Sequence, residues 1–141
     1  MNGSLTTRIW FRVALWCDAR LLPLRISRNA TLNQVLALAG SPRSIRFEAL
    51  SVAYILERVR KTTRRPLLMR DRRCLRQGIL AYRFMSAAGH KVQLHFGVDR
   101  TAHGGSVKAH CWLVHDGQII LNPPEPTMVE VFAYGAEVAN A

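Results

Sequence analysis

The hydrophobic pattern of the chain changes its period near residue 90. Before this point apolar side chains recur every three or four residues, as they do on one face of an α-helix. From Val92 to Val98 apolar residues alternate with polar or small ones, which predicts a strand with one buried face. Two further strands are predicted at residues 107–114 and 118–122. The sequence therefore predicts an α+β fold, with helices first and an antiparallel sheet second.

Three helices are predicted in the N-terminal half of the chain. In residues 5–17, the side chains that share one side, and that we expect to pack on the domain, are Leu5, Ile9, Val13 and Trp16. Peripheral contact of this basic helix with an anionic membrane is the alternative. Thr31 is expected to cap a short helix through Leu38, and Ser44 to cap a longer one through Arg60.

The next helix carries a cysteine in its first turn. Asp71 is predicted as the N-cap, which places Cys74 at the third helical position. The positive end of the helix dipole favours thiolate over thiol there, and so do the neighbouring cations Arg72, Arg73 and Arg76. Cys74 is therefore a candidate nucleophile, and a buried, inert thiol is the alternative.

Small residues follow Cys74 along the same helix face. Gly78 and Ala81 lie at helical spacing after it, and neither can hold a neighbouring strand away from the sulfur. The helix is predicted to end at Ala88-Gly89, with the glycine in the left-handed conformation. A strand is thus expected to lie close to Cys74.

A thiolate nucleophile needs a basic partner, and the best candidate among the five histidines is His110. It lies inside a predicted strand, on the same face as Trp112. A metal site formed by Cys111 with His103, His110 and His115 is a weaker alternative, because adjacent strand residues point to opposite faces and cannot easily bind one ion. We therefore expect no metal and no cofactor.

The turn between the last two strands decides which residue can orient His110. If residues 115–117 form a three-residue loop, Asn122 stands opposite His110, with Cβ atoms about 5 Å apart. A two-residue loop would turn Asn122 to the other face. Asp116 is the rival candidate, but it lies roughly 20 Å along the strand direction from His110. The three-residue register also predicts one apolar face made of Cys111, Leu113, Ile119 and Leu121.

Together these residues predict a cysteine hydrolase site. Cys74 would be the nucleophile, His110 the general base and later the general acid, and Asn122 the acceptor that fixes the imidazole tautomer. The backbone N–H of Cys74 is a natural oxyanion donor. Gln77 is a weak candidate for the second donor, because a polar surface position is expected for it.

Composition restricts the class of protein further. The 141 residues suit one compact unit, which we divide into an N-terminal helical region, residues 1–66, and a core region, residues 67–141. The chain has three cysteines, no long apolar run and no secretory signal, so a cytoplasmic protein is expected. The net charge of +11 favours polyanionic or acidic partners, but no nucleic-acid-binding module accompanies it.

Several motifs resemble those of one enzyme family. They are Arg73-Cys74-Leu75, Phe96-Gly97-Val98, the run from Ala109 to Val114, and Asp116-Gly117. In combination they resemble the transglutaminase-like cysteine peptidases of lasso-peptide maturation, whose signature reads roughly R-C-L, then G-V, then A-H-A-W-V-E with a following D-G. The resemblance covers about residues 70–125.

The resemblance implies a transglutaminase-like or papain-like core and hydrolysis of one peptide bond, between the leader and the core of a ribosomally made precursor. It also implies two partners besides this precursor peptide: a separate leader-recognition protein and an ATP-dependent macrocyclase similar to asparagine synthetase. The catalytic Cys and His of the family correspond to Cys74 and His110. The chain departs from the family where Asn122 replaces the usual Asp and Cys111 the usual Ala.

Other functions fit the same positive charge. A non-catalytic interaction protein would keep the fold and present its basic face to an acidic peptide partner, and a nucleic-acid binder would use the same charge. For the peptidase, we expect acidic segments of the precursor or of its binding protein to dock on Arg64-Arg65 and Arg72-Arg73.

Overall fold

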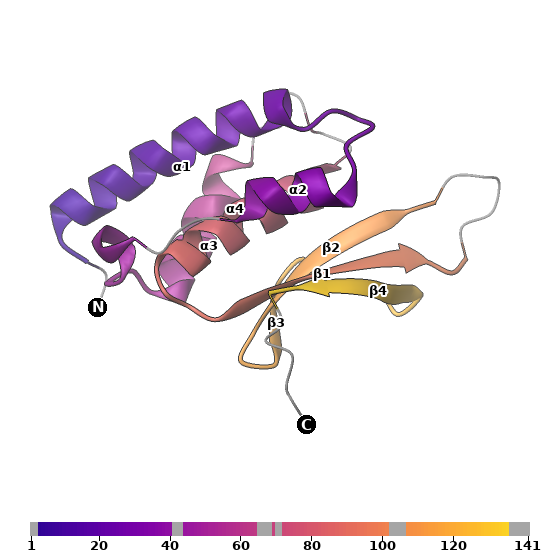
Figure 1. The fold of residues 1–141 in the computed structure, drawn as a ribbon. Coiled ribbons are helices and arrows are strands. Elements are labelled where there is room, and N and C mark those ends of the chain that lie inside the picture. Colours follow the sequence, from indigo (N-terminus) through magenta and orange to yellow (C-terminus); the bar gives the residue numbers. More distant parts are fainter. Residues whose placement is uncertain (1–2, 41–43, 65–68, 70–71, 102–106, 136–141) are drawn as a thin grey trace.

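The computed structural model describes residues 3–40, 44–64, 69, 72–101 and 107–135. Its helices are α1 (Leu5–Arg25), α2 (Leu32–Ala39), the short 3₁₀ helix η1 (Ile45–Phe47), α3 (Val52–Thr62) and α4 (Arg73–Ala87). Its strands are β1 (Val92–Asp99), β2 (Ala109–His115), β3 (Gln118–Leu121) and β4 (Met128–Tyr134). Helices precede strands along the chain (Figure 1), so the predicted α+β order is confirmed.

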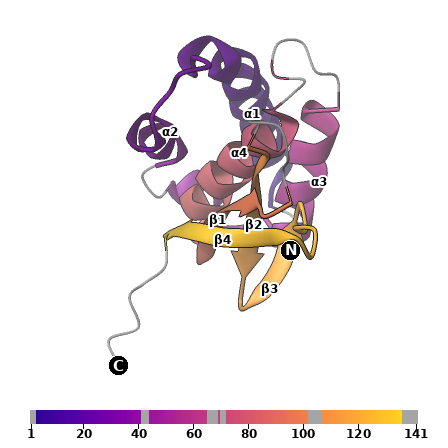
Figure 2. The same ribbon diagram turned by 90° about the vertical axis from the view of Figure 1, so that its right-hand side faces the viewer.

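The strands form one antiparallel sheet in the order β3-β2-β1-β4. The helices lie on one face of this sheet, with α4 against it (Figure 2). One side of α4 packs on β1 and β2, and its other sides pack on α1, α2 and α3. Helix α4 is therefore the element through which the helical layer meets the sheet.

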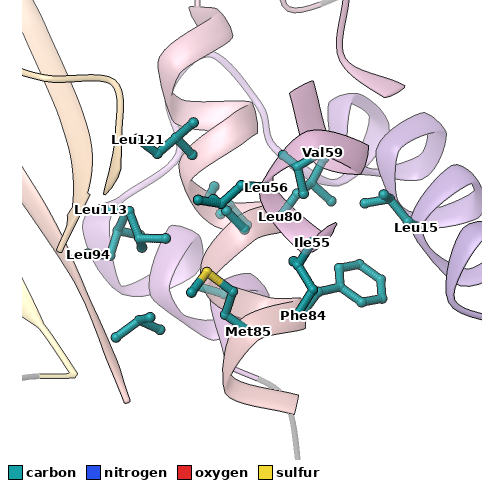
Figure 3. Packing of buried hydrophobic residues seen from close by; sticks show 14 of the residues in the cluster. Leu15, Ile55, Leu56, Val59, Leu80, Phe84, Met85, Leu94, Leu113 and Leu121 are labelled. Carbon is teal, nitrogen blue, oxygen red and sulfur yellow. The ribbon is translucent and has the colours of Figure 1, made fainter. Parts of the chain in front are cut away.

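One continuous hydrophobic core joins the helices to the sheet. Leu94, Leu113 and Leu121 contribute to it from the strands, facing α4 (Figure 3). On the helical side of α4, the ring of Phe84 meets that of Phe11 with centroids 5.3 Å apart and an interplanar angle of 82°. Such edge-to-face pairs add to the free energy gained by burial. The helical region and the sheet thus share a single core.

The face of α1 that packs on the domain is not the predicted one. Its buried residues are Phe11, Leu15, Ala19 and Leu22, whereas its exposed residues include Leu5, Ile9, Val13 and Trp16. Because α1 carries apolar side chains on both sides, helical spacing alone does not determine which side faces the core. Packing favours Phe11, whose ring contacts the rings of Phe47, Tyr54 and Phe84.

The caps of the next two helices differ in how well the sequence predicts them. Thr31 caps α2 as predicted, in a capping box with Gln34. Ser44 makes no side-chain cap bond, and only the short η1 follows it. Helix α3 begins after Ser51, whose hydroxyl accepts a hydrogen bond from the N–H of Tyr54. The single helix predicted from Ser44 is therefore two separate elements.

The β2–β3 hairpin has a two-residue turn, so the predicted three-residue loop is wrong. Asp116 and Gly117 both have positive φ, 48° and 74°. Two consecutive residues of this kind form a turn whose twist matches that of paired strands, and Asp-Gly is a favoured sequence for it. His115 consequently pairs with Gln118.

A bulge in β3 changes which side chains of the hairpin face the core. After it, Leu113 pairs with Leu121. Both of these residues and Cys111 are buried, as predicted, but Ile119 is 49% exposed. An extra residue reverses the alternation of a strand, so the first half of β3 presents the opposite side from its second half.

Strand β4 lies at the edge of the sheet, where it pairs with β1. Within the described ranges, no helix combines the length and the apolarity needed to cross a bilayer.

Candidate active site

Cys74 lies at the start of α4 and is partly buried. The helix begins at Arg73, with Arg72 as N-cap, so Cys74 is the second helical residue and not the third. Arg72 makes no side-chain cap bond, and Asp71, the predicted cap, lies outside the described residues. Amides of the opening turn have no acceptor within the helix. The N–H of Cys74 is therefore placed to donate to an oxyanion beside the sulfur.

Strand β2 approaches α4 closely because Gly78 has no side chain. A Cβ at this position would lie 2.9 Å from Cys111 Sγ and 3.0 Å from Leu94 Cδ1, both well inside ordinary contact distance. Glycine thus allows β2 to place Cys111 against the first turns of α4. The predicted close approach of a strand is confirmed.

Cys111 brings a second sulfur to the site. Its side chain is 1% exposed, and its Sγ donates a hydrogen bond of 3.0 Å to the main-chain carbonyl of Cys74. Its hydrogen bond with the Cys74 sulfur, together with burial, raises the pKa of Cys111 well above its usual value. Cys111 therefore stays protonated and remains a donor. Because a thiol has one proton, Cys111 serves the Cys74 carbonyl or the Cys74 sulfur at any moment, not both.

The pKa of the Cys74 thiol is lowered to about 5. The main cause is the hydrogen bond from the Cys111 thiol; the backbone N–H of Cys111 and the charge and hydrogen bond of His110 also lower it, while burial opposes the shift. The sequence pattern attributed the shift to the helix dipole and neighbouring arginines, whereas in the structure the groups around the sulfur are Cys111 and His110. Cys74 is accordingly a thiolate at neutral pH.

The ring of His110 is held on two sides. Its Nε2 lies 3.0 Å from the main-chain carbonyl oxygen of Asn122, and it stacks on Trp112 with centroids 6.3 Å apart and an interplanar angle of 23°. A carbonyl only accepts hydrogen bonds, so Nε2 carries the hydrogen. Nδ1 is then the ring nitrogen left for Cys74, and in the imidazolium its N–H donates to the Cys74 thiolate, with which the ring is in hydrogen-bond contact.

Asn122 is present at the site, but it meets His110 through a different atom from the one predicted. The main-chain carbonyl contacts the imidazole, while the side-chain Nδ2 donates a hydrogen bond of 3.3 Å to the carbonyl of Cys74. Strand β3 ends one residue earlier, and Asn122 adopts a φ of 52°, a left-handed conformation that asparagine tolerates. The chain leaves the strand there, so its carbonyl reaches His110 despite the two-residue turn.

Cys74 lies between two hollows of different chemistry. One has a volume of about 670 Å³ and is lined by Glu57, Arg60, Lys61, Arg64, Arg73, Cys74, Gln77 and Asn122. The other, of about 290 Å³, is mainly apolar and includes Leu32, Val35, Leu75, Phe96 and His110 in its lining. A peptide lying over Cys74 would therefore meet basic side chains on one side and apolar ones on the other.

Gln77 is buried, so its predicted surface position is wrong. It is 6% exposed, and its Nε2 donates a hydrogen bond of 2.8 Å to Thr63 Oγ1. It also lines the basic hollow beside Cys74. An amide has a second N–H, so Gln77 retains a donor for an oxyanion. The sequence feature that indicates this position of Gln77 is its spacing from Cys74, because residues three apart share a helix face.

Among the described residues, the sequence candidates Asp116 and His115 lie away from Cys74. The carboxylate of Asp116, the rival for orienting His110, is at the far end of β2, 82% exposed and 3.4 Å from His115 Nε2. His103 lies outside the described residues. Within the part of the chain that the structure describes, no three side chains of His, Cys, Asp or Glu gather to hold a metal ion.

Comparison with known proteins identifies the family to which this chain belongs. The family profile described as transglutaminase-like superfamily matches residues 13–133, a stretch that runs from within α1 through α4 and into β4. A search of curated proteins finds no match to the chain, and a search of solved structures finds none either. Since the profile covers most of the sequence, the chain belongs to the transglutaminase-like superfamily.

Proposed function

We propose that the protein is a cysteine peptidase that removes the leader peptide from a lasso-peptide precursor. The superfamily includes cysteine peptidases, which supports the reaction class. The observation that carries the proposal is the Cys74 sulfur, with a pKa of about 5, in hydrogen-bond contact with His110. The motif resemblance to leader peptidases supports the choice of substrate.

The proposed reaction uses each group in a defined role. The Cys74 thiolate attacks the carbonyl carbon of the scissile bond, and the backbone N–H of Cys74 stabilises the resulting oxyanion. Protonated His110 gives its proton to the leaving amine as the C–N bond breaks, which leaves an acyl-enzyme thioester. Neutral His110 then takes a proton from water, whose oxygen attacks the thioester and releases the acid and the Cys74 sulfur.

The proposed setting follows the same resemblance. A separate leader-recognition protein would deliver the precursor, and an ATP-dependent macrocyclase would act on the released core. The cysteines Cys17, Cys74 and Cys111 are all free thiols, which suits a cytoplasmic, reducing compartment.

Cleavage of a precursor tests the proposal directly. The purified chain is incubated with a candidate precursor and its leader-recognition protein, and the products are identified by mass spectrometry. We expect one cut between leader and core, and at least a thousandfold loss of rate, on the order of that seen for lost nucleophiles, in Cys74→Ala. Cys17→Ala, which removes an exposed cysteine, should cleave as the wild type does.

The same experiment separates the peptidase from a basic interaction protein. A non-catalytic binding protein would leave the precursor intact and would bind it equally well with Cys74 or with alanine. Cleavage that survives Cys74→Ala would also overturn the proposal, since it would come from another group or from a contaminant.

A further inference from the structure

Arg76 is a buried cation without a counter-charge among the described residues. It is 3% exposed, and no carboxylate in that part of the chain forms an ion pair with it. One terminal nitrogen donates a hydrogen bond of 2.6 Å to the carbonyl oxygen of Ala19 in α1, while the buried Nε has no partner. Most of the donors of this guanidinium are therefore not used by hydrogen bonds to the protein.

The contact with Ala19 has a local cause. Pro23 lies inside α1, and proline has no N–H to give to the carbonyl four residues earlier, which is that of Ala19. Arg76 supplies the missing donor. This explains one hydrogen bond, but a neutral donor would satisfy the carbonyl equally well, so the positive charge is left without an explanation.

A buried charge costs several kcal/mol unless an opposite charge or further hydrogen bonds offset it. The pKa of Arg76 is lowered, first by burial and then by the neighbouring charge of Arg20. A bound anion would counter both causes. It would replace the solvation that Arg76 loses on burial, and it would offset the repulsion between Arg76 and Arg20.

Arg76 is not sealed inside the core, since it lines a third hollow. This hollow has a volume of about 400 Å³ and lies between α1, α3 and α4, lined by Trp16, Ala19, Arg20, Lys61, Thr62, Arg64 and Arg76. The described residues of this lining include four cations and no acidic side chain. The guanidinium of Arg20 lies 4.3 Å from the ring centroid of Trp16, which holds it at the edge of the hollow.

The hollow is a neighbour of the active-site hollow. Lys61 and Arg64 line both this hollow and the basic hollow that contains Cys74. Among the described residues that line the active-site hollow, Glu57 alone carries a carboxylate, and it is paired with Lys61. A peptide bound over Cys74 would therefore meet side chains that also line the hollow of Arg76.

We propose that this hollow binds an acidic side chain of the substrate peptide, with its carboxylate against Arg76 and Arg20. This site adds a specificity element to the proposed function. That the bound peptide is a substrate rests on that proposed function. A planar guanidinium fits a carboxylate with two parallel hydrogen bonds, and the terminal nitrogens of Arg76, which make one bond to Ala19 among the described residues, have N–H groups left to form them. The shared lining with the Cys74 hollow favours a peptide over a nucleic acid.

Binding of short probes to the full-length Cys74→Ala variant tests the site without any cleavage. The probes are acetylated tetraglutamate amide, tetraglutamine amide and an oligothymidylate with four phosphates, followed by calorimetry and by tryptophan fluorescence. We expect tetraglutamate to bind more tightly than the other two. Arg20→Glu should weaken its binding about tenfold or more, as expected when a charge facing the ligand is reversed.

Arg12→Glu is the matched control, because Arg12 is exposed on the same helix but does not line the hollow. It makes the same change in net charge and should leave affinity within about twofold. Arg64→Glu, just after the end of α3, repeats the test if Arg20→Glu lowers the melting temperature. Equal losses in the Arg12 and Arg20 variants, or equal binding of tetraglutamine, would overturn the proposal. Tighter binding of the oligothymidylate would overturn it in favour of a nucleic-acid site.

These outcomes are separate from those of the cleavage experiment. A chain that binds tetraglutamate at Arg20 but never cuts a precursor would overturn only the peptidase assignment. A chain that cuts the precursor but binds tetraglutamate equally well with Arg20→Glu would overturn only the acidic-side-chain site.

Discussion

Helix α4 makes two contacts that differ in how completely their polar groups are satisfied. Toward β2, the carbonyl of Cys74 receives bonds from Cys111 and Asn122, and the Cys74 sulfur meets Cys111 and His110. Toward α1, the guanidinium of Arg76 makes one hydrogen bond and has no counter-charge among the described residues. Cys74 and Arg76 are only two positions apart on α4.

This difference separates a preorganised site from one that needs a ligand. Groups that perform chemistry must be held in place before the substrate arrives, and the α4–β2 contact does this with bonds internal to the protein. A buried cation with unused donors has the opposite character, because its best arrangement requires an anion from elsewhere. We infer that the α4–β2 contact provides the reaction and the α4–α1 contact helps to select the substrate.

The tight α4–β2 contact can be loosened at one position. Gly78→Ala would place a methyl group 2.9 Å from Cys111 Sγ and 3.0 Å from Leu94 Cδ1, so β2 must move away. Overpacking of this kind costs about 1–3 kcal/mol. Urea unfolding should show this loss of stability. In a separate measurement, alkylation of Cys74 should be slower, because the Cys111 donor is displaced.

Gly40→Ala is the control for this change. Gly40 has a φ of −60°, and the nearest atoms to its added Cβ are 3.8 Å away, so the same substitution meets ordinary contact distances. A Gly78→Ala protein as stable as the Gly40→Ala protein would show that the approach of β2 to α4 is looser than described.

The donor role of Cys111 can be measured through the pH dependence of Cys74. Alkylation by iodoacetamide requires the thiolate, which forms above the pKa, and the pKa of Cys74 is about 5. Cys111→Ala removes the main group that lowers this pKa, so the rate profile should move to higher pH. At pH 6 we expect the rate to fall at least about tenfold, because most of the sulfur would then be protonated.

Two features of the design isolate this effect. The measurement is made in a Cys17→Ala background, since the exposed thiol of Cys17 would also react. Cys111→Ser retains an O–H donor and should shift the profile less than alanine does. Identical profiles for the alanine and wild-type proteins would assign the low pKa to His110 or to the helix terminus instead.

The sequence predicts the meeting of Cys74 and His110 better than it predicts the details around them. A cysteine in the first turn of a helix and a histidine inside an alternating strand are local signals, and each element forms near its expected position. The small Gly78 indicates the close approach that brings the helix and strand together. These features follow from the residues nearby in the chain.

The errors arise where distant contacts choose between local alternatives. Both sides of α1 are apolar, and the rings of Phe47 and Phe84 determine that Phe11 faces inward. The bulge in β3 has no signature in the alternation of the strand, so the register and the atom of Asn122 that meets His110 could not be derived. The hydrogen bond from Arg76 to Ala19 depends on Pro23, in a helix far away in sequence.

The dependence of the Arg76–Ala19 hydrogen bond on Pro23 can be tested by a double-mutant cycle. The expected effect is the smallest of these predictions, and it is the most specific to the α4–α1 contact. Arg76→Met removes both the donor and the charge at similar length. With Pro23 present, it leaves the carbonyl of Ala19 without a donor, which costs about 1–3 kcal/mol, partly offset because no buried charge remains. With Pro23→Ala, the new N–H can complete the helical hydrogen bond to Ala19, so Arg76→Met should cost less. Urea unfolding of the four proteins should give a coupling of about 1 kcal/mol. If Arg76→Met costs the same in both backgrounds, Arg76 does not replace the donor that Pro23 lacks.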